Sequence, residues 1–282
     1  GNIYTSFKPL RIVSALVSCN GRIIYVGDSN KAKRLVTLFN GRIIDLDGKT
    51  VVPGFVDAHV HLDGLGVSLN TLNLRGVGSI SELKERLRKY YEEHKDSSWI
   101  VGRGWDQELF VEKRWPNRWD LDEIVPDKPV FLERICGHAA VVNTKVLEVI
   151  GLLERIPEST YFLKDKNGVL TGIVVEDAVD FFRDRLEYNF DERLRMLRDA
   201  LVYAASLGVT MHGFVSCSPE TFNILQSLKM MEGLPVRVRV YMSDSALDSL
   251  LSLGVRRSFG DEYLKIMGIK IFADGSLGAR TA

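Results

Sequence analysis

Hydrophobic and polar residues follow two different patterns along this chain. Within residues 3–52, short β-branched and apolar runs such as LRIVSALVSC and RIIYVG flank Asn-Gly pairs, which are strong hairpin turn signals. From residue 191 onward, helical patterns such as DERLRMLRDALVYAASLG alternate with short apolar runs. We therefore expect a small β module at the start of the chain. Later, we expect βαβ units that form a parallel sheet with right-handed crossovers.

The pattern between these two regions is mixed. Pro53-Gly54 interrupts the chain, and FVDAHVHL (55–62) is typical of a buried strand. The segment SISELKERLRKYYEEHKD (79–96) predicts an amphipathic helix. Short strands are expected at WIVGRGWD and PVFLERICGH, followed by a helix that begins at Asn143 and ends at Gly151.

Composition excludes several classes of protein. The 282 residues are 45% hydrophobic, which allows a sizeable core, and 37 basic residues balance 37 acidic ones. No clustered basic excess indicates a nucleic-acid partner or an anionic membrane. The three cysteines form no CxxC pair, no run of about 18 apolar residues is present, and the N-terminus lacks a signal-peptide pattern. We therefore expect a cytoplasmic protein that acts on a small molecule.

The strand FVDAHVHL carries candidate metal ligands. His59 and His61 are two residues apart and share one face of the strand with Asp57. Two neighbouring imidazole nitrogens suit Zn²⁺ or a related divalent ion. Packing or surface exposure explains such a pair in a strand about equally well. Its position at the carboxyl end of a strand favours a metal site, because parallel α/β barrels place their active sites there.

Several long motifs resemble one family. PGFVDAHVHL resembles the opening motif of the amidohydrolase superfamily of metal-dependent hydrolases. The YtcJ-like branch, which includes AepA-type exoenzyme-regulatory proteins, is similar at GRGWDQELF (102–110), at residues 121–152 and at IKIFADGSLGARTA (269–282). The resemblance implies a (β/α)8 TIM barrel with a small N-terminal β-sandwich module. It divides the chain into four parts. These are the β-sandwich module (1–52), barrel strand 1 (53–63), an α/β insertion at the barrel mouth (64–189), and barrel helices with strands 2–4 (190–282).

The resemblance also implies a metal ligand on strand four. Lys270 holds the position of a lysine that is carboxylated in family members with a bridged metal pair. A carbamate supplies an anionic bridge of two oxygens, which an ammonium group cannot provide. A lysine at a strand end that reaches solvent is the alternative.

The family's remaining ligands are absent from this sequence. They are one histidine each on strands five and six and an aspartate on strand eight, whereas the sequence ends at Ala282, after strand four. We therefore expect a fragment of a longer protein, inactive alone, with an exposed apolar sheet edge. A barrel completed by a second copy, in a homo-oligomer, is the alternative.

Four residues of the expected insertion are candidate site residues. Trp105, Asp106 and His138 are candidate substrate contacts, and Glu176 could bring a carboxylate to the metal or the substrate. Each has an ordinary alternative. Trp105 could be a core residue, His138 could be hydrogen-bonded in a turn, and Glu176 could be a surface acid near a helix N-terminus. Cys136 is expected to be a small buried side chain.

Two further candidates follow the later strands. His212, in VTMHGFV, is expected to end strand two and face the barrel mouth, or else to pack against the strand. Asp274, just after strand four, could bind substrate or orient Lys270, although Asp274-Gly275 is also a turn signal.

These residues predict a metal-dependent amidohydrolase that cleaves an amide or carbamate-like C–N bond in a small molecule. One or two divalent ions, most simply Zn²⁺, would activate water and polarise the carbonyl. A catalytically inactive barrel kept as a binding or regulatory protein is the alternative, and Lys270 argues against a single-metal deaminase. The candidate metal ligands are His59, His61 and Lys270, and the candidate catalytic residues are Lys270, Glu176 and His138.

Overall fold

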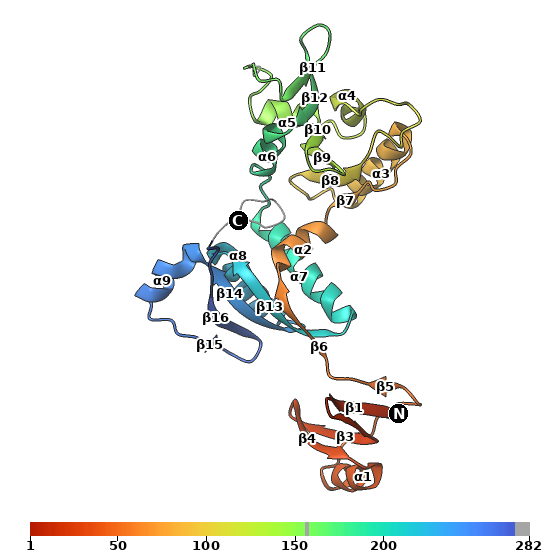
Figure 1. Cartoon of the computed structure of the whole chain (residues 1–282), viewed down its shortest axis with the longest axis vertical. Coiled ribbons are helices and arrows are strands. Elements are labelled where there is room, and N and C mark those ends of the chain that lie inside the picture. The colour runs from red at the N-terminus through yellow and green to blue at the C-terminus, as the bar shows by residue number, and fades with distance from the viewer. Residues whose placement is uncertain (156–157, 274–282) are drawn as a thin grey trace.

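The computed structural model describes residues 1–155 and 158–273, which form three bodies, the third of them inserted in the sequence of the second (Figure 1). The first body is the β module. Its strands form two sheets, in the orders β2-β1-β5 and β3-β4. Its elements are β1 (Asn2–Phe7), β2 (Leu10–Val13), β3 (Ala15–Cys19), β4 (Arg22–Gly27), α1 (Ser29–Leu38) and β5 (Thr50–Val51).

The β3–β4 hairpin follows from the predicted turn. Asn20 and Gly21 have φ values of 49° and 74°, so both occupy the left-handed region that a tight hairpin turn requires. The helix α1 follows this hairpin, and its N-terminus is capped by Asp28, whose carboxylate accepts from the Lys31 amide at 2.9 Å. After the second Asn-Gly pair, at Asn40 and Gly41, the next strand is β5, which spans only Thr50–Val51.

The second body is an open α/β sheet in the order β15-β16-β14-β13-β6. Four of its strands are parallel, as the alternating pattern predicted, and β15 is antiparallel to β16. The described residues form no closed barrel. The strands are β6 (Phe55–Val60), β13 (Val209–Cys217), β14 (Arg237–Ser243), β15 (Phe259–Gly260) and β16 (Leu264–Lys270).

Helices cover one face of this sheet, and the core lies between the two layers. The long helix α7 begins after Asn189, which forms a capping box with Glu192, and it ends before Gly208. Its buried residues recur at helical spacing and pack against β13 and β14. The helices of this body are α2 (Leu62–Leu69), α7 (Phe190–Ser206), α8 (Pro219–Met231), the 3₁₀ turn η1 (Asp244–Ala246) and α9 (Leu247–Ser252).

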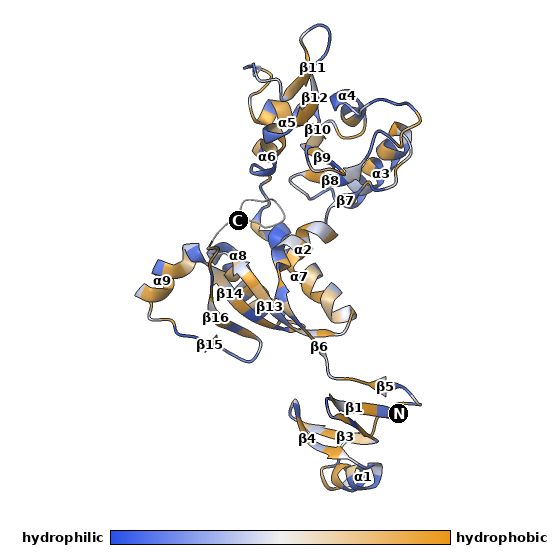
Figure 2. Ribbon diagram, viewed as in Figure 1, coloured by the Kyte–Doolittle hydropathy of each residue, from blue (hydrophilic) through white to orange (hydrophobic). Residues whose placement is uncertain are grey.

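The third body is the insertion between α2 and α7. Its sheet has the order β11-β12-β10-β9-β8-β7, with β7, β8 and β9 parallel and the others antiparallel. One hydrophobic core lies on each face, and the distribution of hydropathy along the ribbon can be followed in Figure 2. Its strands are β7 (Leu72–Asn73), β8 (Ile100–Trp105), β9 (Val130–Arg134), β10 (Ala139–Val142), β11 (Phe162–Lys164) and β12 (Leu170–Val175). Its helices are α3 (Ile80–Glu93), α4 (Arg118–Asp122), α5 (Thr144–Val149) and α6 (Asp177–Arg183).

A buried carboxylate joins the insertion to the α/β body. Glu192 in α7 is 4% exposed, and its two oxygens accept from the backbone amide of Ser98 at 2.6 Å and from its hydroxyl at 2.9 Å. A second link runs from the Asn70 side chain to Asp199 at 3.1 Å. These contacts hold the insertion at the end of the sheet where α7 begins. None of the described helices is both long and apolar enough to cross a bilayer.

Candidate metal and substrate site

The two faces of β6 have different environments. Val60 packs against the core under the helices, together with Leu62 at the start of α2. Because side chains alternate along a strand, His59 and His61 lie on the opposite face. Both histidines are exposed, and their ring centroids are 5.7 Å apart. The Asp57 carboxylate accepts from the backbone amide of His59 at 3.2 Å, and this hydrogen bond constrains the backbone between Asp57 and His59.

The imidazole rings of this pair are free to bind a cation. Within residues 1–155 and 158–273, neither ring makes a hydrogen bond or an ion pair, although the two rings contact each other edge to face at an interplanar angle of 72°. Neutral imidazole nitrogens are typical ligands of Zn²⁺ and other divalent ions. The donor chemistry of His59 and His61 therefore fits part of a divalent metal site.

Lys270 lies at the same end of the sheet but is not brought to the histidines. It is the last residue of β16, and β14 and β13 separate this strand from β6. Three strand spacings of about 4.8 Å correspond to roughly 14 Å across a flat sheet. The Lys270 ammonium lies over the Phe272 ring, 4.9 Å from its centroid. Among the described residues, no group of three or more His, Cys, Asp and Glu side chains could hold a metal ion.

His212 occupies a different place from the one expected. It does not end its strand, because β13 continues to Cys217 through a positive-φ residue, Ser216. His212 is instead paired with Asp57 in the middle of the sheet and is only 1% exposed. Neither ring nitrogen has a hydrogen-bond partner among the described residues. Burial lowers the pKa of His212, and the nearby Asp57 carboxylate opposes this shift. The alternative of a histidine packed within the sheet fits this position better than a substrate contact.

Trp105 is a core residue of the insertion. Its side chain has no exposed surface, and its indole N–H donates to the carbonyl of Leu132 at 2.8 Å. Trp115 and Phe110 pack beside it. The structure therefore supports the alternative that Trp105 is a core residue, rather than a substrate contact.

Asp106 and Cys136 share one partner, Arg134. The guanidinium donates to the Asp106 carboxylate at 2.7 Å and to the side chain of Gln107 at 2.8 Å. Cys136 is exposed, contrary to the expectation of a buried side chain, because it lies in the turn between β9 and β10. Partial burial raises the pKa of its thiol, but Arg134 and the backbone amide of His138 outweigh that effect and lower it. This interaction was not predicted, because nothing in the residue pattern indicated that the side chains of Arg134 and Cys136 contact each other.

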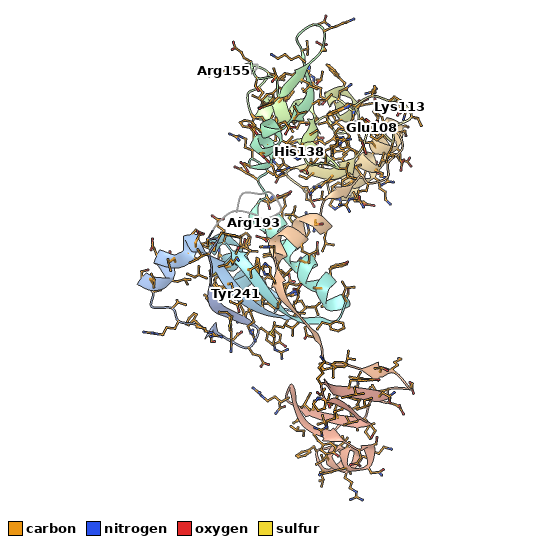
Figure 3. The ribbon with its side chains drawn as sticks, viewed as in Figure 1. Glu108, Lys113, His138, Arg155, Arg193 and Tyr241 are labelled. Atoms are coloured by element: carbon orange, nitrogen blue, oxygen red, sulfur yellow. The ribbon has the colours of Figure 1, made fainter. Side chains whose placement is uncertain are left out.

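His138 and Glu176 are brought together from positions 38 residues apart. The His138 Nδ1 atom lies 3.2 Å from a Glu176 carboxylate oxygen, and the Glu176 amide donates to the His138 carbonyl at 2.9 Å. Their side chains are 73% and 56% exposed. Glu176 precedes α6 with φ 50° and ψ −129°, an unusual conformation for a residue other than glycine. Figure 3 labels His138 within the insertion. Asp274, the remaining candidate, lies outside the described residues.

Comparison with known proteins supports the resemblance drawn from the sequence. A model of the amidohydrolase family matches residues 42–282. The crystal structure of an uncharacterized metal-dependent hydrolase from Pyrococcus furiosus superposes with a TM-score of 0.84. It is 41% identical to this chain, and the alignment covers 99% of this chain and 56% of that one.

Two curated proteins also align over most of the chain. The amidohydrolase candidate YtcJ of Bacillus subtilis (strain 168) is 28% identical over 100% of this chain and 54% of its own length. The N-substituted formamide deformylase of Arthrobacter pascens is 25% identical over 94% of this chain and 53% of its own length. This chain therefore spans about half the length of these relatives. The YtcJ-like resemblance is confirmed.

Proposed function

Because this chain belongs to the amidohydrolase family, we propose that it contributes one part of the active site of a metal-dependent hydrolase acting on a C–N bond of a small molecule. One observation carries the proposal: at the carboxyl end of a parallel sheet, His59 and His61 present two imidazoles that have no hydrogen-bond partner within residues 1–155 and 158–273. This is where parallel α/β folds place their catalytic groups.

In this proposal, His59 and His61 would hold one divalent ion, most simply Zn²⁺, and a carboxylated Lys270 would supply a further anionic ligand at the same end of the sheet. Such a lysine becomes a bridging anion when its amine adds to CO₂, forms an N–C bond and gives up one proton. A bound divalent ion would lower the pKa of a water molecule towards neutrality and polarise the substrate carbonyl. The Asp57 carboxylate accepts from the backbone amide of His59 and so constrains the backbone that carries this ligand.

The insertion supplies the groups that would meet the substrate. Glu176 lies within hydrogen-bond distance of Nδ1 of His138, which leaves the exposed Nε2 free to exchange a proton with a ligand. The Asp106 carboxylate, held by Arg134, is a second candidate contact. His212 and Asp274 remain candidates from the sequence, and His212 would act through Asp57 rather than by touching the substrate.

The type of bond is inferred from one relative. The Arthrobacter protein is an N-substituted formamide deformylase by name, and it aligns with 94% of this chain. In an amide hydrolysis of this type, water adds to the carbonyl carbon, the C–N bond breaks, and the products are a carboxylic acid and an amine. An N-substituted formamide would give formate and the amine.

The test uses the full-length protein and two readouts. Metal content is measured by elemental analysis, and formate release is measured from an N-substituted formamide. We expect His59→Ala and His61→Ala to lose bound metal and hydrolysis together. His94→Gln is the matched control, because His94 stacks on Tyr90 in the insertion and should leave both readouts unchanged. Full metal content and activity in His59→Ala would contradict the proposal. A wild-type protein without metal would favour the binding or regulatory alternative.

A further inference from the structure

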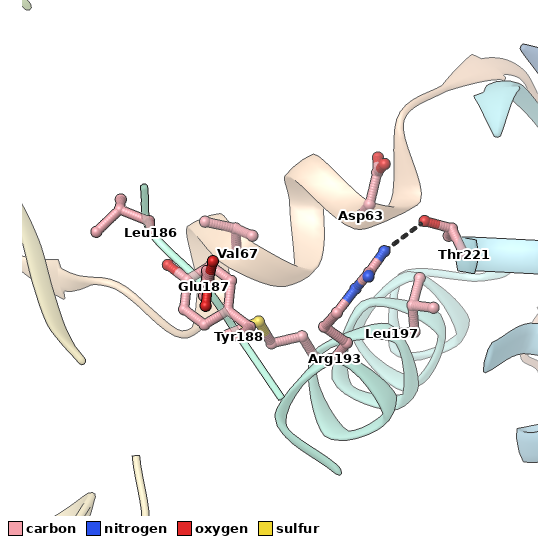
Figure 4. Close-up of a pocket in the computed structure, with 9 residues that line it drawn as sticks. Asp63, Val67, Leu186, Glu187, Tyr188, Arg193, Leu197 and Thr221 are labelled. Carbon is pink, nitrogen blue, oxygen red and sulfur yellow. Dashed lines mark hydrogen bonds between the residues drawn. The ribbon is translucent and has the colours of Figure 1, made fainter. Parts of the chain in front are cut away.

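A cavity of about 480 Å³ lies in the helical layer of the α/β body (Figure 4). This volume is within the range of about 300–1,000 Å³ that is typical of small-molecule sites. The cavity is lined by two residues of α2, three of α7, one of α8 and the segment that leads from the insertion into α7: Asp63, Val67, Arg193, Met196, Leu197, Thr221 and Leu186–Tyr188.

The spacing of these residues explains why they face one space. Asp63 and Val67 are four residues apart, so they lie on one side of α2. Arg193, Met196 and Leu197 share one side of α7 for the same reason. The cavity is distinct from the candidate metal site, because α2 and α7 cover the face of β6 that carries Val60 rather than the face that carries the two histidines.

One end of the cavity carries two opposite charges. Arg193 donates to the Thr221 hydroxyl at 3.2 Å, and its only ion pair among the described residues, to the exposed Glu220, is 3.9 Å long. A guanidinium has five N–H donors, so most of the donors of Arg193 have no partner in the part of the chain that the structure describes. The Asp63 carboxylate accepts from the Gly64 amide at 2.8 Å and makes no ion pair in the described part of the chain. Figure 4 shows Asp63 and Arg193 at the same end of the cavity.

The rest of the cavity is mainly apolar. Val67, Leu186, Met196 and Leu197 contribute aliphatic side chains, and Tyr188 contributes an aromatic ring. Burial raises the pKa of Tyr188 to about 12, so its phenol is uncharged at neutral pH. Glu187 also lines the cavity but is exposed. This arrangement offers one cationic group, carboxylates beside it, and an apolar surface for the remainder of a ligand.

We propose that this cavity binds a zwitterionic small molecule with an apolar side chain, of the class of the apolar α-amino acids. The ligand carboxylate would meet the free donors of Arg193, its ammonium would meet Asp63, and its side chain would lie against Met196 and Leu197. A simple anion would leave Asp63 without an ion pair, and a simple cation would leave the remaining donors of Arg193 without an acceptor. Since a partly buried charge without a partner is costly, a ligand with both charges fits best.

The experiment is isothermal titration calorimetry on the full-length protein with three probes of nearly equal size. L-leucine carries both charges, 4-methylpentanoate lacks the ammonium, and 3-methylbutylamine lacks the carboxylate. We expect L-leucine to bind at least about tenfold more tightly than either of the other two, which is the effect of one lost charged contact of about 1.4 kcal/mol. Equal affinities for the three probes, or no binding of L-leucine, would overturn the proposal.

Three variants assign the binding to the cavity. Arg193→Met keeps an apolar side chain of similar length, and Asp63→Asn keeps the shape of the carboxylate. Each should weaken L-leucine binding at least about tenfold. The control is Arg198→Met on the same helix, because Arg198 pairs with Glu232 away from the cavity and its loss should leave the affinity unchanged. Unchanged affinity in both Arg193→Met and Asp63→Asn refutes the assignment, and either one suffices if the other does not fold.

This inference can fail separately from the proposed hydrolase activity. His59→Ala should abolish metal binding but leave the affinity for L-leucine unchanged, because its ring is on the other face of β6. Loss of L-leucine binding in His59→Ala would show that the probe occupies the metal site instead, and would overturn the separate cavity.

Discussion

The contact between Glu192 and Ser98 should control how firmly the insertion is attached to the α/β body. Glu192→Ala removes a buried carboxylate that accepts from the Ser98 amide at 2.6 Å and from the Asn189 amide at 2.9 Å. A hydrogen bond to a charged group contributes about 1.5–3 kcal/mol. The same substitution removes the capping box at the start of α7, and this loss is included in the free-energy change given below. We therefore expect the free energy of local opening to fall by about 3 kcal/mol.

Hydrogen exchange followed by mass spectrometry measures this opening directly. A fall of about 3 kcal/mol corresponds to roughly 100-fold faster exchange of the protected amides, since 1.4 kcal/mol is a factor of ten. The affected peptides should cover residues 95–101 and 189–197. Glu85→Gln is the control, because Glu85 is an exposed residue of α3 and should change stability by less than about 0.5 kcal/mol. Unchanged exchange in Glu192→Ala would refute the view that this carboxylate fastens the junction.

Three further predictions concern the core, the sheet and pH. Trp105→Phe should destabilise the protein by about 1–3 kcal/mol in urea unfolding, because it leaves a buried carbonyl without its indole donor, yet KM should not change if Trp105 is only a core residue. Gly213→Ala should destabilise by about 1–3 kcal/mol or more, because a Cβ there would lie 2.4 Å from the Ala58 carbonyl oxygen, between β13 and β6. The hydrogen bond from Lys229 lowers the pKa of Asp261 from 3.8 to about 2. The stabilisation from this group is therefore fully present above pH 3.8 and is lost as the pH falls through about 2, so Asp261→Asn should unfold more readily than wild type at pH 6, and this difference should be much smaller at pH 2.

Local sequence patterns predicted the elements better than their contacts. The helix at residues 79–96 and the hairpin turn at Asn20-Gly21 depend on spacing and on residues within a few positions, so the sequence contains most of the information. The parallel order of the strands also followed from alternation of strands and helices. The length of β13, in contrast, did not follow from this alternation. Ser216 adopts φ 57°, which lets the strand continue through a bulge to Cys217 and leaves His212 in the middle of the sheet.

The candidate site could be predicted only where it depends on a single strand. The alternation of β6 is enough to place His59 and His61 on one face. By contrast, the burial of Trp105 depends on the surrounding insertion, and the contact of His138 with Glu176 depends on how β10 meets the start of α6. Such contacts are set by tertiary packing, which a short window of sequence does not contain.

The strand β6 shows why the candidate metal site and the cavity can coexist so close together in sequence. Val60 and Leu62 bury one face of the chain in the core, and this anchoring fixes the opposite face, where His61 is exposed. His61 is also the N-cap residue of α2, so Asp63 is turned away from the metal face within one helical turn. Residues 59–62 thus alternate between surface and core. The helix α2 then directs Asp63 towards Arg193. A substitution at Leu62 should disturb both sites, whereas substitutions at His59 or Arg193 should each disturb one.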